Sequence, residues 1–220
     1  MPIKIMIRDF MGLRDVEVEI SKTLLYGSNM SGKSRVIYAL MNVINHHGLM
    51  EHFAREMGET VGEELKGDYD VVIGDTIVTV KDTLFKVVSP RGEFGPSSYN
   101  AVADYIAEAF RKVGVSRVAW VTDRGDIVIA NVGGASSQMK AGDVKALLER
   151  PEEVERVEEL WKLFTSARRF YYNKVKIEDK WVPPSLLSAG ERKAMTLIYL
   201  AKFTDLLIVE TFEGGLHIDT

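Results

Sequence analysis

The sequence predicts an α/β fold in which an antiparallel N-terminal sheet is joined to a parallel core sheet with flanking helices. Three observations lead to this prediction: apolar residues alternate over positions 3–20, a strand, a glycine-containing loop and a helix follow over 23–45, and residues 206–209 are all apolar. Alternation with period two is typical of half-buried strands, and short apolar runs are typical of buried strands. The 220 residues can form one sizeable domain, which we expect to span 1–220.

The composition is that of an ordinary globular protein, with 46% hydrophobic and 27% charged residues. No apolar run approaches the length of a transmembrane helix, and the charged N-terminus is unlike a secretory signal. The chain has no cysteine, which excludes disulfides and thiolate metal sites. We therefore expect a cytoplasmic protein without a membrane partner. The net charge of -4 argues against coating of nucleic acid by bulk electrostatics, but it leaves room for a local basic groove.

The two ends of the chain give a readable order of elements. Every second residue over 3–7 is isoleucine and 16–20 repeats the alternation, which predicts two antiparallel strands. Residues 33–45 have the apolar spacing of a helix, and another helix is expected to begin near Ser188. The less readable region of about 50–182 is interpreted as an insertion between them. Within it we expect strands over 71–88, 118–132 and 175–182 and helices over 99–113 and 151–164.

Residues 27–34 match the phosphate-loop pattern G-x-x-x-x-G-K-[ST]. In such a loop the glycines let backbone N–H groups turn toward phosphate oxygens at the start of a helix. Lys33 would reach the β- and γ-phosphates, and the hydroxyl of Ser34 would bind Mg²⁺. A strand before the loop and a helix after it favour this interpretation over an accidental glycine turn. The predicted nucleotide-binding residues of the loop are Gly27, Ser28, Asn29, Met30, Ser31, Gly32, Lys33 and Ser34.

Two further segments near the end of the chain contain residues that could take part in binding a nucleotide or Mg²⁺. The segment LSAGE at 187–191 starts a helix, and taken alone it is explained by a serine N-cap with a glutamate three residues later, a capping box. It stands just before the apolar strand 206–209, which ends in Glu210. A carboxylate at the end of a buried strand suits the surroundings of Mg²⁺ beside a phosphate loop. A solvated acid at a strand end is the simpler alternative.

With these motifs in this order, the chain resembles the ABC-type ATPase heads of the RecF and SMC families, which are P-loop NTPases. The resemblance rests on the segments IMIRDFMGLRDVEVEI, GSNMSGKS, LLSAGERKAMTLIYLA and LLIVETFEGGLHID, and the middle of the chain is unmatched. It implies an ATPase that binds ATP and Mg²⁺, closes as a homodimer across two ATP and acts in DNA repair or chromosome maintenance. DNA as a partner rests on this analogy alone.

The resemblance also implies roles for individual residues. The phosphate loop would bind the ATP of its own subunit, whereas Ser188 and Gly190 would cap the γ-phosphate held by the partner subunit. Ser34 and Glu210 would serve Mg²⁺. The family's catalytic glutamate falls on Thr211, whose hydroxyl cannot act as a general base near neutral pH. The residues assigned to the hydrolytic step are therefore Glu210, Thr211 and Glu213, the last being two residues beyond the expected position.

Other departures from the family pattern leave alternatives open. Met11 stands where the family has an arginine, and His217 is not the family's switch histidine, whose strand would follow Thr220. Either the native chain is longer or the site is degenerate. One alternative is therefore a regulatory module that closes on ATP with little or no hydrolysis. Another is the ATPase part of a longer nuclease.

Two weaker clusters have simpler explanations. Since no acid or cysteine stands at ligand spacing, a solvated helix end is favoured over a metal site for His46, His47 and His52. The basic and aromatic run over 168–176 has a composition that could follow a nucleic-acid backbone. A helix end leading into an edge strand explains that run more simply.

Overall fold

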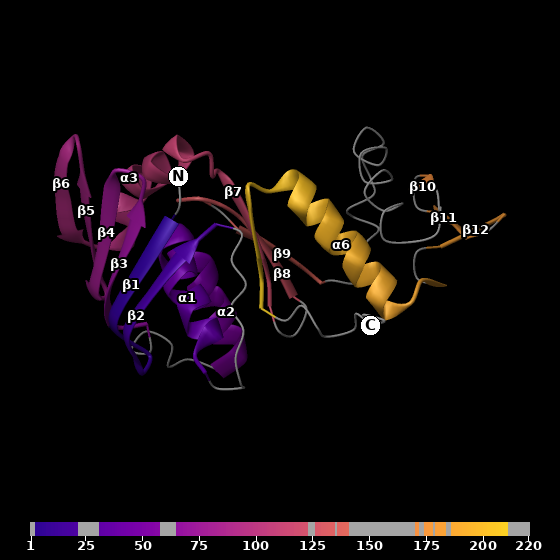
Figure 1. Ribbon diagram of the computed structural model, residues 1–220, viewed down its shortest axis with the longest axis horizontal. Helices are drawn as coiled ribbons and strands as arrows, with labels where there is room; N and C mark the ends of the chain where they lie inside the picture. The colour runs from indigo at the N-terminus through magenta and orange to yellow at the C-terminus, as the bar shows by residue number, and fades with distance from the viewer. Residues whose placement is uncertain are drawn as a thin grey trace. The chain divides into compact units, whose positions relative to one another are not determined.

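The computed structural model divides the chain into two compact units (Figure 1). Unit 1 comprises Met1–Val118 and Ala130–Ser136, and unit 2 comprises Ala119–Ile129 and Ser137–Thr220. Within the described part of the chain, no helix is long and apolar enough to cross a membrane. The described residues are 3–21, 31–57, 65–122, 126–134, 136–140, 170–171, 174–177, 179–183 and 186–210.

Unit 1 is built on a six-stranded sheet with the strand order β2-β1-β3-β4-β5-β6. Every neighbouring pair in this sheet is antiparallel. The alternation seen in the sequence places isoleucines of the first strand on one buried face, where Ile5 is fully buried. The strands are β1 (Ile3–Phe10), β2 (Leu13–Ile20), β3 (Gly67–Ile73), β4 (Thr76–Asp82), β5 (Leu84–Ser89) and β6 (Gly92–Ser97).

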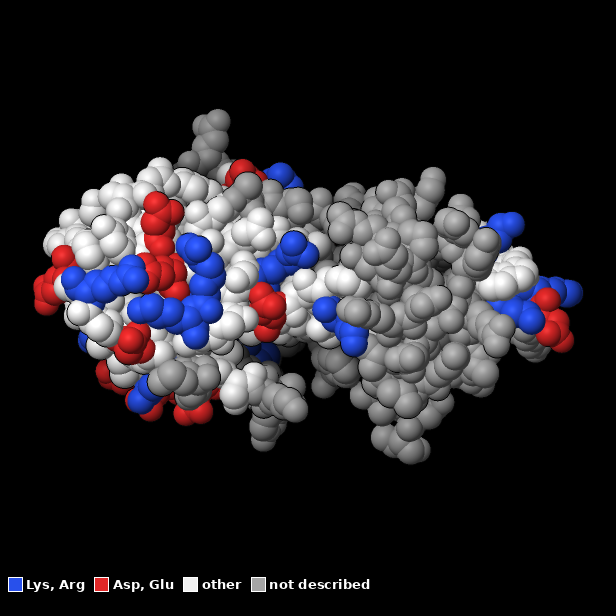
Figure 2. Space-filling view, turned by 90° about the horizontal axis from the view of Figure 1, so that it is seen from above, with Lys and Arg blue, Asp and Glu red and all other residues white. Residues whose placement is uncertain are grey.

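In the described residues of unit 1 the helices are α1 (Lys33–Ile44), α2 (His46–Met57) and α3 (Tyr99–Lys112). Helix α1 contacts β1, β3 and both other helices, and α3 contacts β5 and β6. On the sheet, side chains that alternate with the buried ones form ion pairs, such as Lys4 with Glu17 at 2.7 Å. Figure 2 shows Lys and Arg next to Asp and Glu over one face of the molecule. These exposed pairs contribute little stability, because solvent screens them.

Strands β1 and β2 are joined by a two-residue turn of Met11 and Gly12. Both residues have positive φ angles, 51° and 81°, and Phe10 pairs with Leu13 on either side. Two-residue hairpins favour such turns because their twist matches that of the flanking strands. Glycine adopts this conformation without strain, whereas Met11 does so at some energetic expense.

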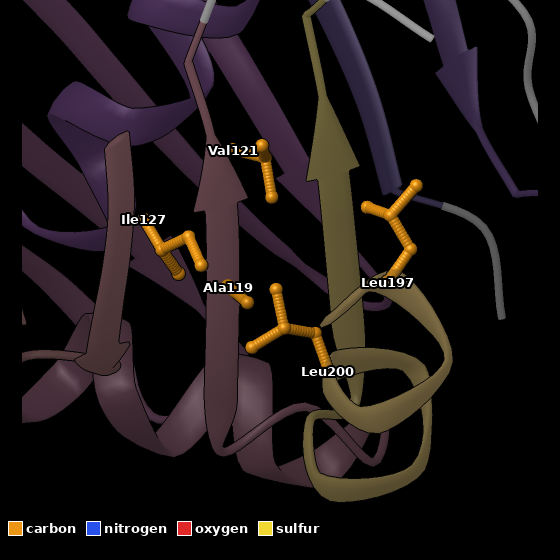
Figure 3. Packing of buried hydrophobic residues seen from close by; sticks show 5 residues of the cluster. All are labelled: Ala119, Val121, Ile127, Leu197 and Leu200. Atoms are coloured by element: carbon orange, nitrogen blue, oxygen red, sulfur yellow. The ribbon is translucent and has the colours of Figure 1, made fainter. Parts of the chain in front are cut away.

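The second sheet has the strand order β13-β7-β8-β9. In unit 2, Leu197 and Leu200 of α6 (Ala189–Phe203) pack against Ala119, Val121 and Ile127 (Figure 3). The arrows of β7 and β13 point the same way in this view, so the sheet is mixed. Its strands are β7 (Arg117–Val121), β8 (Asp126–Asn131), β9 (Ser136–Lys140) and β13 (Leu206–Val209).

A small antiparallel sheet completes unit 2, with strands β10 (Phe170–Tyr171), β11 (Lys174–Ile177) and β12 (Lys180–Val182). Lys176 pairs with Trp181 across β11 and β12, whereas Val175 is fully buried. Because neighbouring residues of a strand point to opposite faces, Lys176 and Trp181 share the face opposite to Val175.

The predicted parallel core of a P-loop NTPase is wrong, because the described sheets are mostly antiparallel. The strands over 67–97 are joined by tight turns, and parallel neighbours would need crossover connections of a dozen or more residues. The apolar run over 206–209 suggested a buried core strand. Instead β13 lies at the edge of a mixed sheet, and all four of its residues are half-buried.

The strands expected within 71–88 and the helix expected over 99–113 are confirmed by β3, β4, β5 and α3. Helix α2 was missed by the sequence analysis, which expected a single helix to end near position 45. The strand expected just before the phosphate loop and the helix expected over 151–164 lie outside the described residues.

Candidate phosphate-binding site

The phosphate-loop motif ends at the start of α1, in unit 1. Gly32 is the N-cap residue, it has a φ of 92°, and no side chain caps the helix there. A Cβ atom at this position would lie 2.4 Å from Cδ2 of Leu13, a distance that real Cβ atoms do not tolerate. Backbone conformation and lack of space therefore both require glycine. Gly27, Ser28, Asn29 and Met30 lie outside the described residues.

The first turn of α1 is cationic. Lys33, Ser34 and Arg35 are half-buried, and the turn contains no acidic residue. The Nζ atom of Lys33 donates to Oγ of Ser31 at 3.3 Å, which holds the ammonium beside the start of the helix. The first backbone N–H groups of a helix have no partner within it, and the helix dipole adds positive potential at the same end. These groups together suit the oxygens of a phosphate.

The start of α6, in unit 2, has a different arrangement. Ser188 is the N-cap residue, and its Oγ accepts a hydrogen bond from the backbone N–H of Glu191 at 3.2 Å. Oε2 of Glu191 accepts from the backbone N–H of Ser188 at 3.0 Å and from its hydroxyl at 2.9 Å. The capping box expected as the simpler explanation of this segment is therefore present. A phosphate bound by Ser188 would compete with Glu191 for the hydroxyl proton.

Glu210 follows β13 and is fixed through its backbone. Its N–H donates to the carbonyl oxygen of Val121 at 3.0 Å, which extends the contact between β13 and β7. The side chain is half-buried, and its Oε1 atom is shielded from solvent. Thr211 and Glu213, which the sequence analysis assigned to hydrolysis, lie outside the described residues, as does His217.

The predicted site residues are divided between the two units. Lys33 and Ser34 belong to unit 1, whereas Ser188, Gly190 and Glu210 belong to unit 2. Ser188 begins α6 and Glu210 comes after the strand that follows this helix. Each unit therefore holds one part of the predicted constellation.

Sequence reasoning missed a buried hydrogen-bond network beneath the break between α1 and α2. Asn42 is 2% exposed, and its Nδ2 donates to the hydroxyl of Tyr69 at 2.6 Å. Nδ1 of His46 lies 2.7 Å from Oδ1 of Asn42. Since the amide oxygen only accepts, Nδ1 of His46 carries the proton. An asparagine on the apolar face of a helix was the only signal in the sequence.

The histidine cluster is therefore more than a solvated helix end. The imidazole of His46 packs against Phe85 and Tyr99, and burial, followed by the nearby His47, lowers the pKa of His46. His46 is half-buried and His47 is exposed, whereas His52 is buried, so the expectation of a solvated side chain is wrong for His52. Among the described residues no group of three His, Cys, Asp or Glu side chains is placed to hold a metal ion.

No protein-family model matches this chain, and no curated protein matches it.

Proposed function

We propose that this protein binds ATP together with Mg²⁺ at the phosphate loop 27–34. The observation that carries the proposal is the start of α1, where a left-handed Gly32 leads into a first turn with Lys33, Ser34 and no acid. In this role Lys33 neutralises charge on the β- and γ-phosphates, and the Ser34 hydroxyl binds Mg²⁺. The motif and this local geometry support the proposal. The prediction of a parallel core sheet, which was wrong, gives it no support.

Calorimetric titration with Mg-ATP tests the proposal. Lys33→Ala should abolish binding, because it removes the ammonium that neutralises the phosphates. Lys112→Ala is a suitable control, since it removes a lysine from the surface of α3 in the same unit. Unchanged ATP affinity in Lys33→Ala would rule the site out.

We further propose that ATP brings two chains together as a homodimer. The resemblance to RecF and SMC heads supports this step, because it gives Ser188 and Gly190 the γ-phosphate of the partner's ATP. The start of α6 presents a hydroxyl and helix N–H groups, which is the chemistry that an anion requires. A role in DNA repair or chromosome maintenance rests on the same resemblance.

We propose that hydrolysis is slow or absent, so that the dimer acts as a regulatory ATP-bound state. The support is Thr211 at the position of the expected catalytic glutamate. General-base assistance contributes about 10² to 10⁴ in rate, and a threonine hydroxyl does not supply it near neutral pH.

A second candidate function is binding of single-stranded nucleic acid by the sheet β10–β12. Trp181 is 46% exposed, and its cross-strand neighbour Lys176 shares its face with Lys174. Exposed aromatic rings stack on bases while lysines follow the phosphates. Asp179 forms an ion pair with Lys176 at 3.3 Å and weakens the positive field.

Fluorescence anisotropy with a labelled oligothymidine tests this candidate. Trp181→Ala should weaken binding by roughly tenfold, since stacking on one base is worth about 1–3 kcal/mol, whereas Trp181→Phe should retain most of it. If wild-type protein and Trp181→Ala bind the oligonucleotide equally, the sheet β10–β12 is not the binding surface.

A further inference from the structure

The break between α1 and α2 holds two other parts of unit 1. Asn45 interrupts the helix with φ and ψ angles of -153° and 76°. The carbonyl oxygen of Ile44 accepts hydrogen bonds from the hydroxyl of Tyr99 at 2.9 Å and from the backbone N–H of Gly133 at 3.1 Å. A Cβ atom on Gly133 would lie 2.9 Å from the carbonyl oxygen of Ala103, so this segment is packed closely on α3. One carbonyl group therefore joins the break to the start of α3 and to the segment after β8.

Two histidines at the start of α2 extend this contact with α3. The ring of His46 packs against Phe85 and Tyr99, with centroid distances of 5.6 and 5.4 Å. The ring of His47 meets Tyr99 edge-on at 5.8 Å, and its Nε2 atom lies 2.6 Å from Oδ1 of Asn100. Together with the two hydrogen bonds to the carbonyl oxygen at the break, we call these contacts the junction latch.

The helix ends around the latch disfavour a positive charge on His46. This residue is the first of α2, and its ring lies beside Tyr99, the first residue of α3. The positive ends of two helix dipoles are therefore close to the imidazole. The first turns of α2 and α3 contain no acidic residue. In the described part of the chain, neither histidine of the latch forms an ion pair with a carboxylate.

The titratable groups that face His46 supply no negative charge. Burial raises the pKa of Tyr99 of α3 to about 12, and it also raises the pKa of Tyr69 of β3, which is linked to this histidine through the buried network. Both hydroxyls are therefore neutral near physiological pH. Strand β5 contributes the apolar ring of Phe85, and the remaining titratable neighbour is His47, whose charge would repel a second one.

We propose that the junction latch is an acid-sensitive switch, in which protonation of His46 opens the latch and releases the start of α3 and the segment around Gly133 from the break between α1 and α2. In the closed latch Nδ1 of His46 donates to Asn42, so the added proton goes to Nε2, beside the aromatic rings. Residues Ala130–Ser136 belong to unit 1 and are followed along the chain by unit 2, so opening loosens unit 1 where the chain leaves it. The inference is independent of the proposed ATP site.

The direction of the switch follows from where His46 binds a proton more readily. Burial, followed by the nearby His47, lowers the pKa of His46 in the closed latch, whereas a solvated imidazole titrates near 6.5. The open form therefore binds the proton more readily. As pH falls below about 6.5, the open population rises by up to about tenfold per pH unit, until pH reaches the lower pKa of the closed latch.

Hydrogen–deuterium exchange of the full chain at about pH 7.5 and 5.5 tests the switch, with rates corrected for the intrinsic effect of pH on exchange. Amides that lie at the latch should exchange at least about threefold faster at the lower pH, because exchange follows the open population. These are the amides over 48–52 and 101–105 and the amide of Gly133. Amides of β3 and β4 should change by less than about twofold.

Two variants assign the effect to one ring. His46→Gln stays uncharged at both pH values and should lose the acceleration at the latch. His47→Gln removes the exposed neighbour and should open nearly as the wild type does. Equal acceleration in His46→Gln and wild type would overturn the proposal, and so would an equal acceleration of β3 and β4, which would mean that the whole unit is destabilised.

The wild-type chain gives a second test that needs no variant to fold. Exchange at the latch, followed from about pH 7.5 to 4, should begin to rise near pH 6.5, where a solvated histidine titrates. A rise that begins only near pH 4 would assign the opening to carboxylates and overturn the switch. Unchanged exchange over the whole range would overturn it as well.

Discussion

The starts of α1 and α6 are both helix N-termini with a serine and a glycine, but they satisfy their backbone groups differently. At α6 the backbone N–H groups of Ser188 and Glu191 are occupied by the reciprocal hydrogen bonds of the capping box. At α1 no side chain caps the helix, and the first turn carries Lys33 and Arg35 without an acid. Capping explains the α6 segment through helix stability alone. It does not explain α1, where an incoming anion would complete the electrostatics.

The same residue types therefore play different parts at the two helix starts. The α1 start has basic side chains and a left-handed glycine that packing requires. At the start of α6 only the resemblance to RecF and SMC heads suggests a ligand, because the capping box already accounts for Ser188 and Glu191. Variants at the two helix starts should therefore separate ligand binding from folding.

The largest expected effect is on assembly. Ser188→Arg should abolish ATP-induced dimerisation, because it places a large side chain where the partner's γ-phosphate would sit, while ATP binding at α1 stays nearly intact. Light scattering with and without Mg-ATP measures this. Ser188→Thr keeps a cap of similar quality and should still dimerise. Normal dimerisation of the arginine variant would mean that α6 only stabilises its own unit.

The next effect is on turnover. Thr211→Glu should raise single-turnover hydrolysis at saturating ATP by at least about tenfold, since it supplies the missing general base, with little change in affinity. Thr211→Gln introduces a side chain of about the size of glutamate that cannot act as a base, so it should not raise the rate of hydrolysis. Brisk hydrolysis by the unmodified chain would instead point to Glu213 as the base.

A smaller effect is expected from the capping box itself. Glu191→Ala removes the acceptor of two hydrogen bonds at Ser188 and should lower the free energy of unfolding by about 1 kcal/mol. Glu191→Gln retains an acceptor and should lose less. Urea unfolding measures both. An unchanged midpoint in Glu191→Ala would show that the box contributes nothing, and the contrast with α1 would disappear.

The smallest expected effect is a pH dependence of stability in unit 1. Burial lowers the pKa of His46, so the unfolded chain binds a proton more readily than the folded one. Stability is therefore present above the unfolded pKa of about 6.5 and is lost as pH falls through that value toward the lower folded pKa. Urea unfolding at about pH 7.5 and 5 should show less of this loss in His46→Gln than in wild type. The variant His47→Gln, which changes the exposed neighbour, should lose nearly as much stability at low pH as the wild type.

Local patterns predicted local structure well. The alternation over 3–20 gave the β1–β2 hairpin, and the serine–glutamate spacing gave the start of α6. Strand direction was beyond those patterns, because an apolar run such as 206–209 suits a buried parallel strand and a half-buried edge strand alike. The buried network was also beyond them, since Tyr69 is 27 positions away from Asn42. For the same reason, the contact of His47 with Asn100 could be found only in the folded chain.

Hydrogen–deuterium exchange with and without Mg-ATP tests the contrast between the two helix starts most directly. We predict that ATP protects the amides over 32–36 at any protein concentration, because binding occurs within one chain. Protection over 188–192 should appear only at concentrations where the dimer forms, and Ser188→Arg should lack it. Absence of protection over 32–36 under saturating Mg-ATP would contradict the assignment of the phosphate site to α1.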